Sequence, residues 1–351
     1  MKLRTEILGN VRRLVVKLGS GVVGSGVDPL VAQIGVLHEQ GRQVILVSSG
    51  AIAAGMGVLG MNQRPQLLAE LQACAAIGQG KLMAAYDASF GKHGRYVAQV
   101  LLTHDDLRHR SRHLNARNTL ETLLACGVVP IINENDTVAV DEIKFGDNDR
   151  LSALVATLVD ADLLVILSHV EGLHDRGSGI PAATGRDKNV APTVIPIVPA
   201  ITQDIEQLAG GTDRVTSIGG MKSKIDAAKI VTRAGIPMLI ASGERGNVLP
   251  DLLAGEDFGT IFLPKAGKLA SRKRWIAFFQ RPAGTIVVDD GAKKALCEAG
   301  KSLLAKGVVR TEGMVGAGDV VSICDKTGAE FARGLMRDGS VMVHRDDLVI
   351  L

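Results

Sequence analysis

Aromatic side chains are scarce in this sequence. Its 351 residues include seven Phe, two Tyr and one Trp, which together make up 3% of the chain. Stacking on nucleic-acid bases depends on such side chains, so this protein cannot bind nucleic acid by extensive base stacking. The net charge of +3 is mildly basic and argues neither for nor against a polyanionic partner.

Paired cysteines and metal-binding histidine motifs are also missing. The four cysteines are scattered without a CxxC pair: Cys74, Cys126, Cys297 and Cys324. This usage fits reduced thiols in a cytosol better than a disulfide framework or a zinc site. The histidines form no HxH or HExxH pattern, and the group His104, His109 and His113 lies among arginines, as expected of a surface face. We therefore assign no side chain as a metal ligand.

Long hydrophobic runs are absent as well. No run reaches the length of a membrane span, and residues 1–13 lack the apolar core of a signal peptide. Hydrophobic residues nevertheless make up 46% of the chain and charged residues 22%, which is ordinary for a globular protein with a sizeable core. We expect a soluble cytoplasmic protein of two domains with no membrane partner.

Apolar strands alternate with helical patterns over the first 262 residues. The predicted strands are 13–18, 43–47, 96–102, 128–132, 163–167 and 237–240. The predicted helices are 29–40, 67–90, 115–125, 150–159, 196–211 and 222–234. Nearly continuous apolar strands separated by helices predict an α/β fold, with a mostly parallel central sheet sandwiched by helices.

The composition changes near residue 263. A basic segment, 263–282, contains Arg272, Lys273 and Arg274 in succession. Short apolar strands separated by Gly and Asp follow at 285–288, 307–310, 319–323 and 341–343. We therefore predict an α/β domain at 1–262, a basic linker at 263–282 and a small β-rich barrel at 283–351.

The densest polar cluster lies at 129–149, in VPIINENDTVAVDEIKFGDND. An apolar strand there gives way to Asn133, Glu134, Asn135 and Asp136, and a second polar group ends at Asp149. In parallel α/β sheets, ligands bind beyond the carboxyl ends of the strands. The cluster suits a small polar molecule, a metal–phosphate complex, or both. A solvated loop with Asx-turns is the alternative for any single residue.

Two glycine motifs resemble nucleotide-binding patterns without fulfilling them. Gly19, Gly21 and Gly24 match the dinucleotide fingerprint, but the helix is predicted to begin later, at Pro29, and the second strand ends without an acidic residue. An NAD oxidoreductase would require the first helix to begin at Gly21. Gly78-Gln79-Gly80-Lys81 lacks the other P-loop residues and is interpreted as an interruption of a helix.

Two lysines are candidates for binding a phosphate. Lys17 lies in an apolar strand, where burial is costly unless the lysine meets an anion or reaches the edge of the sheet. Lys224 follows Gly219 and Gly220 in the first turns of a predicted helix, where the backbone can approach a phosphate closely. Both lysines could converge on one site with Asp149, and such a cationic set suits phosphoryl transfer. The segment 48–51, SSGA, heads another helix, either as an anion site or as a plain N-cap.

Five segments in this order resemble the glutamate 5-kinases of the amino acid kinase superfamily. They are VVKLGS, VSSGAIAAG, LNARNTL, INENDTVAVDEIKFGDNDRLSA and GGMKSKIDAAKI, and the resemblance spans about residues 11–262. The tail, with RKRW, GTIVVDDGA and VHRDDL, resembles a PUA domain. The fourth segment is specific to this kinase among its relatives, so the resemblance extends to the reaction.

The resemblance implies ATP-dependent phosphorylation of the γ-carboxylate of L-glutamate, the first step of proline biosynthesis, with ATP and Mg²⁺ required. Lys17 and Lys224 would stabilise the transferring phosphoryl group, and Asp149 would organise them. The implied glutamate-binding residues are Ser49, Asp136 and Asn148. The implied nucleotide-binding residues are Lys17, Ser168, His169, Gly219, Gly220, Met221 and Lys224.

The resemblance also implies partners. Relatives are feedback-inhibited by proline and work as homo-oligomers, which predicts a dimer or tetramer here. Glutamyl phosphate cyclises readily, which makes transfer to a glutamate-5-semialdehyde dehydrogenase plausible. RNA binding by the tail is a further hypothesis.

The nucleotide half departs from the family pattern. This chain has Ser168-His169 where relatives have Thr-Asp, and Ser217-Ile218 where they have Gly-Thr. The glycine-rich loop 175–189 lacks the usual Asp-Pro and Asn-Pro turns. Other hypotheses are a kinase for aspartate, N-acetylglutamate or a nucleotide, and an RNA-binding protein that acts through its tail.

Overall fold

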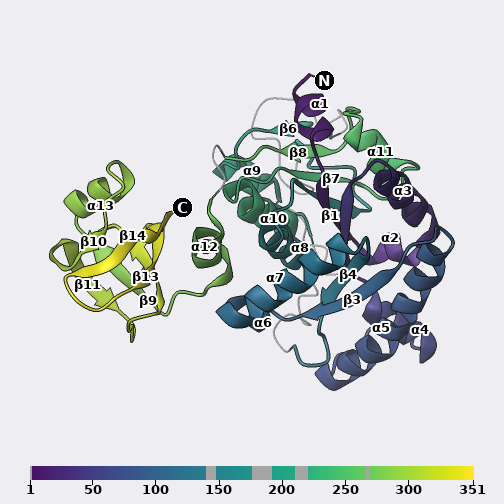
Figure 1. The fold of residues 1–351 in the computed structure, drawn as a ribbon, viewed down its shortest axis with the longest axis horizontal. Coiled ribbons are helices and arrows are strands. Elements are labelled where there is room, and N and C mark those ends of the chain that lie inside the picture. The colour runs from purple at the N-terminus through teal and green to yellow at the C-terminus, as the bar shows by residue number, and fades with distance from the viewer. Residues whose placement is uncertain (1, 140–147, 176–191, 210–219, 266–268) are drawn as a thin grey trace. The chain divides into compact units, whose positions relative to one another are not determined.

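The chain folds into two compact units, Met1–Ala266 and Gly267–Leu351. The computed structural model (Figure 1) describes residues 2–139, 148–175, 192–209, 220–265 and 269–351. Within these ranges, no helix combines the length and apolar character needed to cross a bilayer.

An eight-stranded sheet organises the first unit, with the strand order β3-β4-β2-β1-β5-β7-β8-β6. The strands are β1 (Arg13–Leu18), β2 (Gln43–Ser48), β3 (Val97–Leu102), β4 (Val129–Glu134), β5 (Leu163–Ser168), β6 (Ile197–Val198), β7 (Met238–Ser242) and β8 (Thr260–Phe262). All neighbouring pairs are parallel except β7 and β8, which are antiparallel. The predicted mostly parallel sheet is confirmed.

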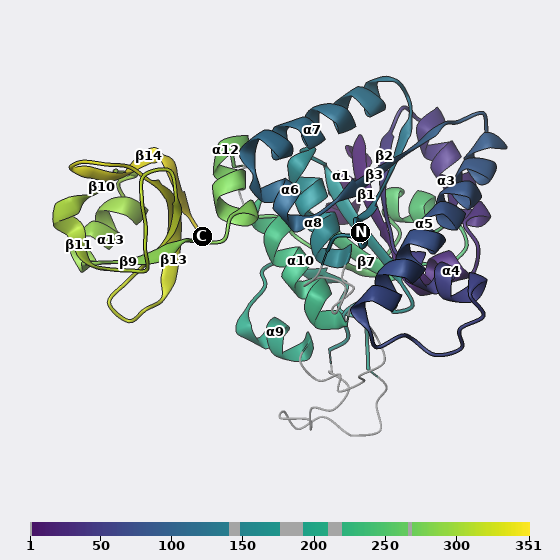
Figure 2. The same ribbon diagram turned by 90° about the horizontal axis from the view of Figure 1, so that it is seen from below.

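Helices cover both faces of this sheet (Figures 1 and 2). They are α1 (Lys2–Gly9), α2 (Ser20–Gly24), α3 (Asp28–Glu39), α4 (Ala51–Val58), α5 (Leu68–Gly91), α6 (His104–Arg108), α7 (Arg110–Ala125), α8 (Asn148–Leu158), α9 (Gln203–Ala209), α10 (Met221–Arg233) and α11 (Val248–Leu253). Figure 2 shows α3 and α5 on one side of the sheet and α7, α8 and α10 on the other.

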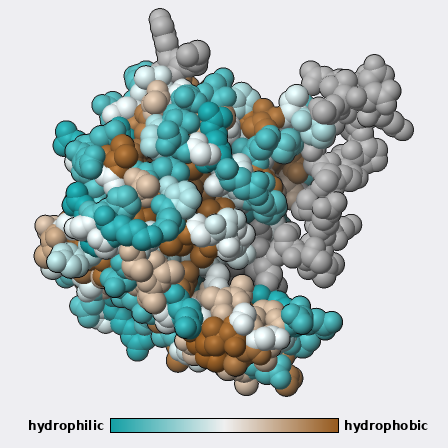
Figure 3. All heavy atoms as spheres, turned by 90° about the vertical axis from the view of Figure 1, so that its right-hand side faces the viewer, coloured by the Kyte–Doolittle hydropathy of each residue, from teal (hydrophilic) through white to brown (hydrophobic). Residues whose placement is uncertain are grey.

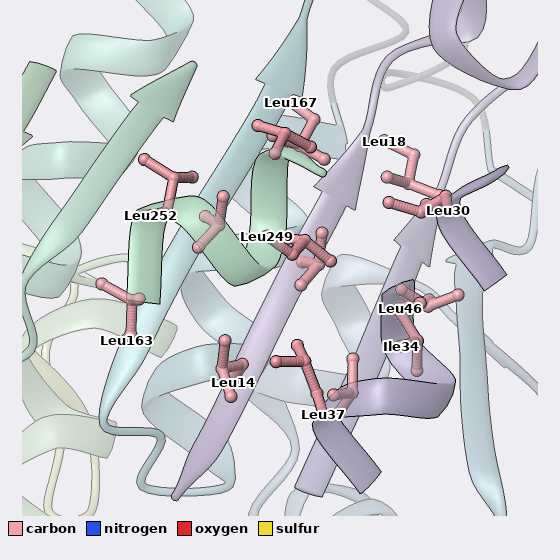
Figure 4. Close-up of a cluster of buried hydrophobic side chains, with 14 of the residues drawn as sticks. Leu14, Leu18, Leu30, Ile34, Leu37, Leu46, Leu163, Leu167, Leu249 and Leu252 are labelled. Atoms are coloured by element: carbon pink, nitrogen blue, oxygen red, sulfur yellow. The ribbon is translucent and has the colours of Figure 1, made fainter. Parts of the chain in front are cut away.

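The side chains on the two faces of β1 contact different helices. Leu14 and Leu18 are buried on the face that α3 and α11 cover (Figure 4). Because successive side chains of a strand point to opposite faces, Lys17 belongs to the other face, where α8 packs. A single lysine in an apolar strand is therefore directed away from this hydrophobic cluster.

Some helices differ from the prediction. The helix predicted at 29–40 is confirmed as α3, but a short additional helix, α2, begins at Ser20 within the first glycines. The predicted helix 196–211 is instead β6 followed by α9. The interruption predicted at Gly78 does not exist, since α5 continues through it.

A six-stranded sheet with the order β10-β14-β13-β12-β9-β11 forms the second unit. Its strands are β9 (Gly284–Val288), β10 (Leu303–Leu304), β11 (Val308–Glu312), β12 (Val320–Cys324), β13 (Glu330–Met336) and β14 (Val341–Ile350). Its helices are α12 (Ser271–Arg274), a π-helical turn (Trp275–Phe279), α13 (Asp290–Cys297) and a 3₁₀ turn (Ala305–Gly307). The predicted β-rich tail is confirmed, whereas the boundaries at 262 and 282 stay a prediction.

One buried carboxylate joins two parts of this unit. Asp347 of β14 is 1% exposed and lies 2.6 Å from Arg272 Nε of α12 and 2.6 Å from Arg337 Nη2. A buried carboxylate is tolerated where two guanidinium groups compensate its charge. Arg272, in the basic segment, thus packs within the second unit.

Candidate active site

A pocket of about 540 Å³ lies beyond the carboxyl ends of the central strands. It is lined by Lys17, Gly19, Ser20, Gly21, Val22, Ser49, Gly50, Ala51, Ile52, Ala53, Arg64, Asn133, Glu134, Asp136, Asn148, Ser168, His169 and Lys224. The strand order reverses at β1, which pairs with β2 on one side and β5 on the other. This switch point is where open α/β sheets bind their ligands.

Lys17, Asp149 and Lys224 form a buried charge cluster at the pocket. Lys17 Nζ lies 2.6 Å from Asp149 Oδ1, and Lys224 Nζ lies 3.2 Å from Asp149 Oδ2. Ser223 Oγ lies 2.7 Å from the same Oδ2. The exposed fractions are 6% for Lys17, 3% for Lys224 and 0% for Asp149. The structure thus brings together the three residues predicted to be catalytic.

Each member of this cluster comes from a different element. Lys17 is the penultimate residue of β1, Asp149 is the second residue of α8, and Lys224 lies in the first turns of α10. Since α8 and α10 pack together, the two helices bring their first turns to the face toward which Lys17 points. Three segments distant in sequence therefore converge on one point.

The lysines decide the charge state of Asp149. Burial acts to raise the pKa of its carboxyl, but Lys17 and Lys224 outweigh burial and hold the pKa below its ordinary value. Asp149 is therefore ionised at neutral pH. Because both of its oxygens face lysine ammonium groups, Asp149 positions the lysines rather than presenting a free carboxylate.

A hydrogen-bonded network of carboxamides underlies the other half of the pocket. Asn148 Nδ2 donates to Ser48 O at 2.8 Å and to Asn133 Oδ1 at 2.8 Å, and lies 3.2 Å from Ser49 Oγ. Asn133 Nδ2 donates to Gln79 Oε1 at 2.9 Å. A hydrogen bond thus links Asn148 to Ser49, and both residues were predicted to bind substrate. Asn148 is in turn linked to Asn133, and through it to Gln79.

Gln79 was missed because Gly78 was interpreted as a helix break. Gly78 has another function, since a Cβ there would overlap the carbonyl oxygen of Ala51 and lie 2.5 Å from Gly55 N. Glycine permits α4 and α5 to approach closely, and this approach brings Gln79 under the pocket. Continuity of the helical pattern on both sides of Gly78 was the available signal.

Asp136 lies in the pocket with an altered acidity. Burial, and then the charge of Glu134, raise the pKa of Asp136 to about 6, while Arg64 opposes the shift. Arg64 also lines the pocket and was not predicted as a site residue. It comes from the segment between α4 and α5, which has no motif that points to a function.

The predicted nucleotide-binding residues are only partly brought together. Ser168 ends β5 and lines the pocket with His169. Gly220 precedes α10 as its N-cap and Met221 begins the helix, but neither lines this pocket. Gly219, Ser217, Ile218, residues 140–147 and the loop residues 176–191 lie outside the described residues.

The cluster fits a phosphate-bearing ligand. It holds two ammonium groups and one carboxylate, so these three residues carry a surplus positive charge beside the pocket. Groups of three or more potential metal-binding side chains are absent from the described part of the chain. Mg²⁺ brought by a nucleotide keeps phosphate and water ligands, so it needs no cage of protein side chains. The residues are consistent with a nucleotide–Mg²⁺ complex.

Comparisons with known proteins agree with this chemistry. The model of the Amino acid kinase family matches residues 12–242, and that of the PUA domain matches residues 284–342. A glutamate 5-kinase from Geobacter sulfurreducens is 46% identical over 381 aligned positions, which cover 99% of this chain and 100% of the relative. Glutamate 5-kinases from Pelobacter propionicus and Syntrophotalea carbinolica are each 45% identical, with the same coverage.

These matches span nearly the whole chain, and four of the five family motifs contribute residues to the pocket. The chain belongs to the glutamate 5-kinases of the amino acid kinase family, with a C-terminal PUA domain.

Proposed function

We propose that this protein phosphorylates the γ-carboxylate of L-glutamate with ATP, giving L-glutamyl 5-phosphate in the first step of proline biosynthesis. The main support is the buried cluster of Lys17, Asp149 and Lys224, which lies at the switch point of the sheet. The chain's membership of this kinase family agrees with it. Transfer of a phosphoryl group needs cations around its oxygens and little covalent chemistry.

The two lysines neutralise the charge that develops during transfer. Lys17 and Lys224 face the pocket with their ammonium groups fixed by Asp149, so they require little reorganisation at the moment of reaction. The substrate carboxylate is already ionised at neutral pH, so the direct in-line attack needs no general base. ATP supplies the phosphoryl group, and Mg²⁺ shields its phosphates.

The opposite half of the pocket binds the amino acid. We assign glutamate binding to Ser49, Asp136 and Asn148, with Asp136 facing the α-ammonium. The position of Asn148 within a hydrogen-bonded network supports its role, because an amide nitrogen that donates to both Ser48 O and Asn133 Oδ1 keeps the side chain in a fixed orientation.

The nucleotide is assigned to the side of the pocket at β5 and α10. Lys17, Lys224, Ser168 and His169 line the pocket there, and Gly220 and Met221 lie at the start of α10. We also assign Gly219 to nucleotide binding. His169 is exposed, and it replaces the aspartate of the family pattern, so it is the residue most able to alter base preference.

We further propose that the protein is inhibited by proline and forms a homo-oligomer. Proline would compete with glutamate, and the product would pass to a glutamate-5-semialdehyde dehydrogenase in the cytoplasm.

A homo-oligomer, dimer or tetramer, is supported by apolar side chains exposed around α4 and α5: Val58, Leu59, Met61, Leu67 and Ile77. Figure 3 shows hydrophobic residues gathered at the lower end of this face. Light scattering after gel filtration would give the number of subunits.

Trapping the acyl phosphate tests the function. Protein, ATP, Mg²⁺, L-glutamate and hydroxylamine should yield γ-glutamyl hydroxamate, and proline should lower the yield. Aspartate, N-acetylglutamate and a reaction without amino acid serve as controls. Hydroxamate from aspartate but not from glutamate would contradict the proposal. Product with another nucleotide but not with ATP would indicate that Ser168, His169, Ser217 and Ile218 have changed nucleotide preference.

The remaining alternatives have less support. The helix α2 does begin at the glycines of the dinucleotide fingerprint, as an oxidoreductase requires. However, β2 ends at Ser48 without a carboxylate for a ribose, and the chain belongs to a kinase family. RNA binding by the second unit stays a hypothesis beside the kinase function.

A further inference from the structure

Glu134 is a buried carboxylate at the pocket that the proposed function does not yet use. It is the last residue of β4, only 6% exposed, and it lines the pocket. Asp136 lies two positions further along, in the turn that follows β4, and it lines the same pocket. Two carboxylates therefore face the same pocket.

The carboxylate of Glu134 has an unsatisfied oxygen, Oε1, which is itself buried. Its Oε1 accepts no hydrogen bond within the part of the chain that the structure describes. The imidazole Nδ1 of His104 lies 3.7 Å away, which exceeds hydrogen-bonding distance. A buried carboxylate that served only the fold would have its oxygens satisfied, because an unmade hydrogen bond at a buried charge is costly.

His104 and Arg150 fix the position of this carboxylate. Arg150 Nε donates to His104 Nε2 at 3.2 Å, so in the neutral ring the proton is on Nδ1, the nitrogen that faces Glu134. A capping box between Thr103 and Asp106 holds His104 at the start of α6. His104 Nδ1 thus lies on the side of the buried Oε1, and the Glu134 carboxylate stands in the wall of the pocket.

The two carboxylates disfavour each other when no cation lies between them. After burial, the charge of Glu134 is the second cause that raises the pKa of Asp136, and Arg64 is the opposing charge. Like charges at close range in a partly buried site are relieved by a cation. An ammonium group carries three donors and one positive charge, and therefore satisfies both carboxylates at once.

We infer that Glu134 binds the α-ammonium of the substrate together with Asp136, and that His104 and Arg150 act as positioning residues for it. This inference rests on the proposed function and adds a specificity determinant, because a dicarboxylic acid without an amino group would meet two unpaired carboxylates. Glu134 would thus select an amino acid over the corresponding plain diacid.

The test compares L-glutamate with glutarate, which has the same two carboxylates and no ammonium. In the Glu134→Gln variant, the KM for glutamate should rise by about 10- to 100-fold while kcat changes little, since a charged hydrogen bond to the substrate is lost. The inhibition constant of glutarate against glutamate should instead fall or stay the same, because a repelling charge is removed. The Glu134→Asp variant, which keeps the charge, should recover part of the lost affinity.

A pH profile gives a second readout. In the unaltered protein, the KM for glutamate should fall as pH rises through the pKa of Asp136, at about 6, because the ionised carboxylate binds the ammonium. Glu134→Gln removes one cause of the raised pKa, so this inflection should move to lower pH. The variant leaves the other titratable groups near this pair, Arg64 and His104, unchanged. Glu39→Gln, an exposed carboxylate at the end of α3, is the control for loss of one negative charge.

The outcomes separate this inference from the function on which it rests. Equal weakening of glutamate and glutarate in Glu134→Gln, with an unmoved pH inflection, would overturn the role of Glu134 and indicate a structural one. An unchanged KM for glutamate would overturn it as well. If the unaltered protein forms no hydroxamate from glutamate, the proposed function fails first and this inference with it.

Discussion

At the scale of single residues, the charge cluster at β1 carries the sharpest expectation. Lys17→Ala or Lys224→Ala should lower kcat by about 100-fold or more, because each removes a preorganised cation from the transferring group. The KM for glutamate should change much less, because neither lysine is assigned to the amino acid. Steady-state kinetics with the hydroxamate assay measure both constants.

Lys229 provides the matched control for these variants. It lies on α10 like Lys224, but its ammonium pairs with Glu206 at 2.9 Å rather than with Asp149. Lys229→Ala should leave kcat nearly unchanged, because exposed ion pairs contribute little. A loss confined to the KM in Lys17→Ala or Lys224→Ala would contradict the assigned roles.

Asp136 is expected to lower stability when no substrate is bound. The pKa of Asp136 is raised from 3.8 to about 6 in the folded protein, mainly by burial and then by Glu134. The unfolded chain therefore loses this proton more readily, so ionisation favours unfolding as pH rises from 3.8 and has its full effect above about 6.

Asp136→Asn removes this cost. We expect the variant to be more stable than the unaltered protein by about 1 to 3 kcal/mol at pH 8, since one pKa unit corresponds to about 1.4 kcal/mol. The difference should shrink as pH is lowered to 5. Urea unfolding at both values measures it, and a difference independent of pH would contradict the explanation. Glutamate binding should weaken in the same variant.

At the scale of elements, the crossing of α4 and α5 depends on glycine. Gly78→Ala should destabilise the protein by about 1 to 3 kcal/mol, because the added methyl group overlaps the backbone of α4. It should also raise the KM for glutamate, because a displaced Gln79 loosens Asn133 and Asn148.

Gly80 lies on the same helix and supplies the opposite case. A Cβ at Gly80 meets nothing within 4 Å, so Gly80→Ala should stabilise the protein by about 0.5 to 1 kcal/mol. Thermal unfolding of both variants compares one substitution at two sites of one helix. Equal effects would refute the role of close packing at Gly78.

The elements also show what a sequence can and cannot predict. The strands β1, β2 and β5 were predicted to within a residue because strands buried on both faces are continuous apolar runs. The helix α2 was missed because its glycines have low helix propensity, and tertiary packing overrides that preference. The antiparallel pairing of β8 depends on contacts distant in sequence, which local patterns do not encode.

The same distinction applies to the site. Lys17, Asp149 and Lys224 stand out in the sequence because each is an ionisable residue at the end or start of an apolar element. The roles of Gln79 and Arg64 depend on how α5 and the segment after α4 fold back, so no local feature reveals them. Glu134 was visible in the polar cluster, but only its burial and its position at the pocket distinguish it from Asn135.

At the scale of the whole molecule, the two units can be separated in an experiment. A chain that ends after Lys265 keeps the backbone hydrogen bonds from Leu263 N to Val198 O and from Lys265 N to Thr232 O, which a cut at the predicted boundary of 262 would remove. This shortened chain should fold and keep most of its kinase activity, because every residue of the pocket precedes the cut.

Circular dichroism and the hydroxamate assay check this expectation. The separate second unit, mixed with labelled RNA, tests whether any RNA affinity belongs to the tail. A shortened chain that is folded but inactive would contradict independence of the kinase unit.

The surplus positive charge of the Lys17, Asp149 and Lys224 cluster has a practical consequence. Two cations face one carboxylate in a nearly dry place, so a counterion from the medium is attracted whenever no substrate is bound. Sulfate and inorganic phosphate have the charge and shape of the transferred group. The choice of buffer anion, and not ionic strength alone, should therefore set the apparent affinity for nucleotide.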